Sequence, residues 1–194
     1  IVASHYRPNI GGVETHLEDL VSALVRRKWE VIVATYSPLA RNVKASIYES
    51  KKNLTIYRMP WLGFNIVHKL SNYPVLEFLY LFPGLFVVIG FALLKNLDVK
   101  AIRAQGLVPA VASLVWAKLT GKKIIMSTHN LYFFPKKGLY TWFSKMVLSQ
   151  LDEILCLSHQ SEMEIRSIGV KSKIVHGYRY WLDLEMFKPV AKSI

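Results

Sequence analysis

The feature that most constrains the fold is a change of hydrophobic period within the first 28 residues. The chain begins with a short apolar run, Ile1-Val2-Ala3, which predicts the end of a buried strand. Pro8, Gly11 and Gly12 then favour a tight loop with few side chains. Beyond this loop, five apolar residues fall on one helical face: Val13, Leu17, Leu20, Val21 and Leu24. Acidic residues in the first turns and basic residues at the end suit the helix dipole. Strand, glycine turn and helix predict the first unit of a parallel α/β domain.

The glycine turn has a chemical use, because a backbone without Cβ atoms lets a ligand approach closely. The free N–H groups of the first helical turn would point at such a ligand, and a phosphate suits them. The pattern around Gly11 and Gly12 is neither GxGxxG nor GxxxxGK[ST]. Two interpretations therefore stand side by side: an anion site, or two glycines that only form the turn.

The rest of the chain continues the α/β alternation. Strands are expected at residues 30–35, 53–59, 98–104, 122–128, 152–157 and 173–176, and helices at 74–94, 107–119 and 140–151 and from Ser158 to Gly169. Residues 36–53 and 60–73 are expected to be loops. The helix at 140–151 is expected to turn four side chains inward: Trp142, Phe143, Met146 and Val147. The pattern predicts an α/β fold of Rossmann-like, three-layer α/β/α type with a mainly parallel sheet.

Composition narrows the function classes. The net charge of +12 fits nucleic acid, an anionic membrane or an anionic substrate, but the basic residues are scattered and no nucleic-acid motif accompanies them. We therefore expect no nucleic-acid partner. The single cysteine, Cys156, lies in an apolar run and is expected to be a buried side chain of a cytoplasmic protein. No cluster of metal-ligand type is present, and no signal peptide is visible at the start.

The most apolar segment is Pro74–Leu94, in which Glu77 is the only charged residue. It is long enough to span a bilayer, but Glu77, the internal Pro83-Gly84 and the flanking strands favour a helix of the protein core. A helix whose outer face contacts lipid or a partner remains the second interpretation, ahead of a true span. With the basic charge, this second interpretation suits peripheral binding to an anionic membrane surface.

The opening residues, YxPxxGGVExHxxxLxxxL followed by RKWEVIVAT, resemble the N-terminal half of a family 4 glycosyltransferase with the GT-B fold. The motif GGVETH, residues 11–16, also resembles the corresponding motif of enzymes that glycosylate phosphatidylinositol and related lipids. The resemblance implies transfer of a sugar from a nucleotide-sugar to an acceptor, here expected to be lipid-linked, with retention of configuration and without a metal or other cofactor. It implies that residues 1–189 form the acceptor-side domain, that 190–194 begin the linker, and that a C-terminal domain lies outside this chain. Because the chain opens inside a strand without Met, we expect a piece of a longer protein that is inactive alone.

The resemblance also assigns roles to residues. Gly11 and Gly12 would contact the donor diphosphate, and His129, at the carboxyl end of a buried strand in a TxH element, would contact the donor sugar as the catalytic residue. Seven further residues are candidates for the acceptor or the cleft: His5, Tyr6, Arg7, Glu14, Gln105, Asn130 and Ser158. Arg103 and Gln105 replace the histidine pattern common in the family. For Ser158 a helix N-cap is favoured over a ligand role.

Other segments carry weaker indications. His16 is expected either at the surface or in packing on the first helix, and His68, His159 and His176 are expected to be structural. Residues 60–73 would border the acceptor pocket, and residues 131–138 fit an ordinary exposed loop better than a lid or lipid-facing lip. Asp183 and Phe187-Lys188-Pro189 resemble the family's passage into the second domain.

One function of another class stays open: a noncatalytic Rossmann-like module that binds an anionic ligand or a membrane surface. A nicotinamide-dependent oxidoreductase is disfavoured, because the glycine loop lacks GxGxxG and Thr35-Tyr36-Ser37 offers no ribose-binding acid.

Overall fold

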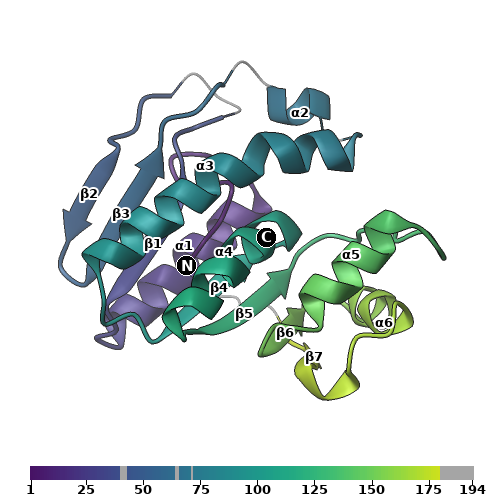
Figure 1. Ribbon diagram of the computed structural model, residues 1–194. Helices are drawn as coiled ribbons and strands as arrows, with labels where there is room; N and C mark the ends of the chain where they lie inside the picture. The colour runs from purple at the N-terminus through teal and green to yellow at the C-terminus, as the bar shows by residue number, and fades with distance from the viewer. Residues whose placement is uncertain (40–42, 64–65, 71, 180–194) are drawn as a thin grey trace, which may run out of the picture.

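The computed structural model describes residues 1–39, 43–63, 66–70 and 72–179. Figure 1 shows a twisted sheet with helices on both faces. The elements in chain order are α1 (Gly12–Arg26), β1 (Val31–Tyr36), β2 (Tyr48–Lys51), β3 (Leu54–Met59), α2 (Ile66–Leu70), α3 (Pro74–Lys95), β4 (Ala101–Gln105), α4 (Leu107–Thr120), β5 (Lys123–Thr128), α5 (Leu139–Leu148), β6 (Glu153–Cys156), α6 (His159–Ser167), a 3₁₀ turn at 172–174 and β7 (Val175–Gly177).

Val2 joins two ladders into one sheet. The ladders run β1-β3-β2 and β4-β5-β6-β7, and Val2 bridges Ala34 of β1 and Ala104 of β4 in parallel. Its N–H donates to the carbonyl of Arg103 at 2.8 Å, and its carbonyl accepts from the N–H of Gln105 at 2.9 Å. The strand order is thus β2-β3-β1-Val2-β4-β5-β6-β7, parallel except for β2 against β3. The predicted opening strand and mainly parallel sheet are confirmed.

The two faces of the sheet carry different helices. Leu17 and Val21 of α1 pack with Val33 and Ile56 in one buried cluster. The next residue of β1, Ala34, points to the opposite face, where it belongs to a larger cluster with residues of α3, α4, α5 and α6. The predicted three layers are therefore confirmed. Because α1 leads from Val2 to β1 on one face and α3 leads to β4 on the other, the order in which parallel strands are added to the sheet reverses between Val2 and β4. We call this point the chain reversal. Open α/β sheets place ligands beyond the strand ends at such a reversal.

Helix α3 is a core helix that packs unusually closely on its neighbours. A Cβ on Gly84 would lie 2.4 Å from the Tyr36 ring, and one on Gly90 would lie 2.2 Å from the Trp116 ring. The Tyr36 hydroxyl accepts from the N–H of Leu85 at 2.9 Å and donates to the carbonyl of Leu81. The hydroxyl therefore lies between the carbonyl of Leu81 and the N–H of Leu85, which are four residues apart in the helix and flank Pro83. One side of this helix lies in the core, as the first interpretation expected, and the other side is exposed.

The structure differs from the sequence expectations in four places. An antiparallel edge strand, β2, lies inside the expected loop 36–53, and the short α2 lies inside the expected loop 60–73. Trp142 and Met146 are exposed, by 62% and 40%, where inward positions were expected. Val147 is buried, as expected, together with Ser144 and Leu148, because that side of helix α5 faces the core. The last strand begins at Val175 after a 3₁₀ turn.

The expected passage to a second domain, with Asp183, Phe187-Lys188-Pro189 and the linker at 190–194, lies outside the described residues. The boundary at residue 189 stays a prediction.

Candidate active site

A cleft of about 800 Å³ lies at the carboxyl ends of the strands, at the chain reversal. One side comes from the exit of the Val2 strand and the start of α1, with His5, Val13 and Glu14. The floor comes from the exits of β4 and β5. The far wall comes from the first half of α3 and the segment between β5 and α5. These contribute, among others, Gln105, Gly106, His129, Asn130, Glu77, Phe78, Leu81, Tyr132 and Tyr140. Residues from opposite halves of the sheet thus meet in one space.

His129 is held in the cleft floor by Gln105. Its Nε2 lies 2.6 Å from Oε1 of Gln105, and because a carbonyl oxygen only accepts, Nε2 carries the proton and Nδ1 is an acceptor. Burial lowers the pKa of His129 to about 4, with smaller contributions from the nearby His16 and Arg103. The imidazole is therefore neutral at physiological pH.

His16 is a site residue that the sequence interpretation missed. Its side chain is only 4% exposed, and its ring centroid lies 5.3 Å from that of His129. Burial is the main cause that lowers its pKa, followed by the positive charge of Arg103. The sequence feature that could have indicated its burial is its position on the apolar face of α1, next to Leu17 and one turn before Leu20. Periodicity alone did not show that this face meets the end of β5.

Arg103 and Tyr178 complete a polar cluster with the two histidines. Arg103 Nε donates to Ser127 Oγ at 3.0 Å, and its guanidinium lies 5.9 Å from the centre of the Tyr178 ring. Desolvation lowers the pKa of Arg103. Arg103 and Gln105 are two residues apart on β4 and point to the same face of the sheet. A cation thus lies near His129 and adds a smaller contribution to the lowering of its pKa by burial.

The predicted glycine turn begins α1 and adjoins the cleft. Gly11 is the extended N-cap, with φ −174° and ψ 173°, and Gly12 is the first helical residue. A Cβ on Gly11 would lie 2.4 Å from Oε2 of Glu14, so this carboxylate folds back over the glycine. No described atom lies within 4 Å of a Cβ built on Gly12. The two glycines do not themselves line the cleft, but Val13 and Glu14 do.

The other cleft candidates divide into two groups. His5, Glu14, Gln105 and Asn130 line the cleft together with His129. Burial lowers the pKa of His5, and the negative charge of Glu14 opposes this shift.

Tyr6 and Arg7 are not among the described residues that line it. Tyr6 is buried in the core cluster beneath α1, where its ring fills space between the helix and the sheet. Arg7 donates to Glu18 at 3.1 Å on the outer side of α1.

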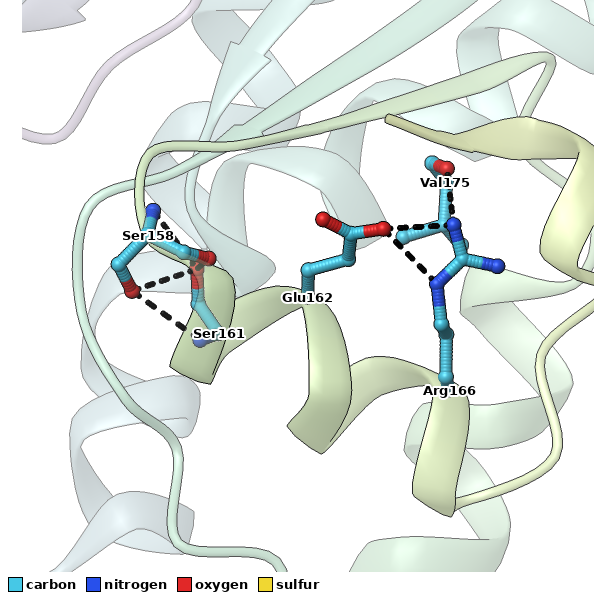
Figure 2. Close-up of polar contacts among 5 residues, drawn as sticks. All are labelled: Ser158, Ser161, Glu162, Arg166 and Val175. Carbon is cyan, nitrogen blue, oxygen red and sulfur yellow. Dashed lines mark hydrogen bonds and ion pairs between the residues drawn. The ribbon is translucent and has the colours of Figure 1, made fainter. Parts of the chain in front are cut away.

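Ser158 is the N-cap of α6, as the favoured interpretation predicted. Its Oγ accepts from the N–H of Ser161 at 3.1 Å, and Ser161 Oγ accepts in return from the N–H of Ser158. Figure 2 shows this capping box beside the ion pair of Glu162 and Arg166, which also donates to the carbonyl of Val175. The hydrogen bond from Arg166 to Val175 connects α6 to β7. Ser158 does not belong to the described lining of the cleft.

The segment between β5 and α5 is more fixed than an ordinary exposed loop. The N–H groups of Tyr132 and Phe134 donate to the two carboxylate oxygens of Glu164, at 2.9 and 3.2 Å. Phe133, between them, has a φ of 50° and is 78% exposed. The segment 131–138 is thus an exposed loop, as expected, and its first residues also form part of the cleft wall.

Metal binding was not expected from the sequence. Within the described ranges, no group of three or more His, Cys, Asp or Glu side chains is placed to hold a metal ion.

Comparison with known proteins identifies the family. The model of glycosyltransferase family 4 matches residues 10–178. The chain belongs to glycosyltransferase family 4. It is 25% identical, over 98% of its length, to a phosphatidylinositol N-acetylglucosaminyltransferase subunit of Arabidopsis thaliana. It is 22% identical, over 82% of its length, to the gpi3 subunit of the corresponding transferase in Schizosaccharomyces pombe. The chain spans 41% of the first relative and 33% of the second.

Solved structures show the same fold. Sucrose-phosphate synthase from Thermosynechococcus elongatus matches 97% of this chain and 49% of its own, with a TM-score of 0.71 and 15% identity. HepE of Anabaena, solved in complex with UDP-glucose, matches 97% of this chain and 45% of its own, with a TM-score of 0.62 and 10% identity. This family 4 chain therefore has the Rossmann-like fold of one half of a GT-B glycosyltransferase, as the sequence predicted.

Proposed function

We propose that the full protein transfers a sugar from a nucleotide-sugar to an acceptor, with retention of configuration. The observation that carries the proposal is the cleft at the chain reversal, where the start of α1 and a neutral His129 meet. Family membership and the UDP-glucose complex of HepE support a nucleotide-sugar as the donor. In this proposal residues 1–179 supply one wall of the reaction site, and a second domain supplies the other.

The polar groups of the cleft have distinct roles. The N–H groups at the start of α1 stabilise the donor diphosphate, whose negative charge grows as the sugar leaves. Because the Glu14 carboxylate covers Gly11, donor binding displaces it, and it then faces the acceptor side of the cleft. His129 Nδ1 accepts a hydrogen bond from a sugar hydroxyl, while Gln105 holds the ring in the tautomer this needs. In this proposal no metal ion is required, because the leaving charge is met by the backbone N–H donors of α1 and by basic side chains of the second domain.

We further propose a lipid-linked acceptor. The cleft is polar at His5, Glu14 and Asn130, whereas the side formed by α3 and the β5–α5 segment is mostly apolar, with Glu77 as its charged residue. Large apolar side chains are exposed on the elements that form that side: Leu76, Leu79, Phe133, Leu139 and Trp142. This division suits an acceptor with a hydroxyl-rich head group and apolar tails. Because both curated relatives are named for N-acetylglucosaminyl transfer with phosphatidylinositol, this lipid with N-acetylglucosamine as the donor sugar is the first pair to test.

The site of action in this proposal is the cytoplasmic surface of a membrane. Among the described helices, α3 alone is long and apolar enough to cross a bilayer, yet eight of its residues are buried against the rest of the protein. Because these residues are buried against the protein, we favour a helix that does not cross the bilayer but contacts the membrane surface with its exposed side. Sedimentation of the full-length protein with liposomes, with and without anionic lipid, tests this: we expect binding that anionic lipid strengthens, and no binding to either would contradict it.

The proposed reaction is tested by a donor and acceptor screen on the full-length protein. His129→Ala should lower kcat by about 100-fold or more, because the hydrogen bond to the reacting sugar is lost. His159→Ala is the matched control, since that exposed imidazole lies on α6 outside the cleft, and it should leave the rate unchanged. Equal rates for His129→Ala and wild type would remove His129 from the mechanism. A noncatalytic module would bind a nucleotide-sugar or lipid but transfer nothing.

A further inference from the structure

A second, apolar groove lies between the edge of the sheet and α3. It has a volume of about 520 Å³, within the usual range of ligand sites. Its lining comes from the segment around β2, from β3 and from the second half of α3: Ile47, Tyr48, Tyr57, Arg58, Met59, Pro60, Val87, Val88, Phe91 and Lys95. We call it the β3–α3 groove. It shares no lining residue with the cleft, and Glu77 and Phe91 are about 21 Å apart along α3 at the helical rise of 1.5 Å per residue.

The groove opens beside an apolar stripe on the outer side of α3. Five side chains at helical spacing form this stripe, each between 50% and 70% exposed: Leu76, Leu79, Val87, Phe91 and Leu94. A surface helix of a soluble protein normally presents polar residues on this side. Val87 and Phe91 belong to both the stripe and the groove, so whatever covers the stripe also faces the groove mouth.

The charges around the groove select the kind of occupant. Lys95 is exposed, and its Nζ lies 5.8 Å from the centre of the Phe91 ring. The other cation, Arg58, is nearly fully buried and pairs with Glu49 at 2.5 Å. No Asp or Glu is among the lining residues that the structure describes. An apolar trough with a lysine at its end complements a molecule with an apolar chain and an anionic head.

We propose that the β3–α3 groove binds one acyl chain of an anionic membrane phospholipid, with Lys95 at its phosphate. The bound chain holds the outer side of α3 flat on the bilayer. This site is separate from the acceptor cleft and does not depend on sugar transfer. It assigns the lipid a role in attachment, distinct from that of a substrate.

Photolabelling tests the proposal directly. The full-length protein is mixed with phosphatidylcholine vesicles that contain phosphatidylserine with a diazirine on one acyl chain, and labelled peptides are mapped after irradiation without donor. Labels are expected within residues 47–60 and 87–95. Phe91→Gln should lower labelling of these peptides about tenfold, because an aromatic side chain no longer contacts the chain. Lys95→Glu should lower it for phosphatidylserine more than for a phosphatidylcholine probe.

Leu119→Gln is the matched control, since Leu119 is 70% exposed on α4 and lies outside the groove; its labelling should equal wild type. Thermal melting checks that each variant folds, and Val87→Gln replaces Phe91→Gln if the latter does not. Labels confined to Phe133 and α5, or equal labelling of wild type and groove variants, would overturn the proposal and leave a protein partner as the occupant. Sugar transfer is measured separately, in detergent. A failure of the labelling prediction therefore does not imply a failure of the proposed sugar transfer, and the reverse also holds.

Discussion

At the scale of single residues, the candidate site contains a histidine that stays neutral. His129 donates to Gln105 from Nε2, and burial near Arg103 lowers its pKa to about 4. Its pKa in the unfolded chain is about 6.5, so protonation favours unfolding. The stability that depends on the neutral ring is complete above pH 6.5 and is lost as the pH falls toward 4.

The substitution Gln105→Glu should favour the protonated form of His129 over the neutral form. A carboxylate at the position of the amide would stabilise the protonated ring and raise the pKa of His129 above its wild-type value. NMR titration of the histidine ring protons measures this, and the acid limb of the pH–rate profile should move to higher pH. Gln160→Glu, at an exposed position on α6, is the control and should change neither. A His129 pKa that is the same in wild type and Gln105→Glu would show that the contact is not formed in solution.

The sequence predicted part of the residue-level site. It placed His5, Glu14, Gln105, Asn130 and His129 at strand or turn exits, and the structure brings all five into one cleft. It misplaced Tyr6 and Arg7, because the direction of a side chain in an irregular loop follows from packing beneath α1. It missed His16, because a helical period identifies a buried face but not what that face meets.

At the scale of elements, α6 depends on its N-cap. Ser158→Ala removes the acceptor for the N–H of Ser161 and should lower the free energy of unfolding by about 1 kcal/mol. Ser167→Ala, near the other end of α6, is the control and should change stability by less than about 0.5 kcal/mol. Urea denaturation of both variants measures the difference. Equal midpoints would contradict the cap assigned in Figure 2.

Helix α3 depends on two glycines for its close contact with the sheet and α4. In Gly90→Ala the new Cβ would overlap the Trp116 ring, whose Nε1 donates to the carbonyl of Phe86 at 2.8 Å. We expect a loss of about 1–3 kcal/mol from overpacking, although alanine favours helices. Gly12→Ala at the start of α1, with no described atom within 4 Å of the new Cβ, should be neutral or slightly stabilising. Thermal melting decides: a more stable Gly90→Ala would contradict the packing described.

The sequence predicted elements with a strong apolar period and missed those without one. Helices α1, α3 and α4 and strands β1, β3 and β5 fall within about two residues of expectation, and β4 begins three residues later than expected, at Ala101. Strand β2 was missed because its residues, Tyr-Glu-Ser-Lys, are mostly exposed at the sheet edge and carry no alternating apolar pattern. In α5 the apolar residues surround the helix, so composition could not select its buried face.

At the scale of the whole molecule, the position of Val2 determines the function proposed. By pairing with β1 and β4 it brings the loop before α1 beside the exits of β4 and β5. The sequence showed each part, but only the strand order shows that they share a cleft. The outer side of α3 and its groove, on the same layer as the far cleft wall, would keep that cleft near a membrane.

The central claim is that the start of α1 and His129 face one cleft that binds the donor. Its most direct test is calorimetric measurement of nucleotide-sugar affinity in the full-length protein, wild type against Gly12→Val. The added methyl groups would enter the space where the diphosphate is expected, and no described atom lies within 4 Å of a Cβ at this position. We predict at least about a tenfold loss of affinity with an unchanged melting temperature. Unchanged affinity in a folded Gly12→Val protein would contradict the account.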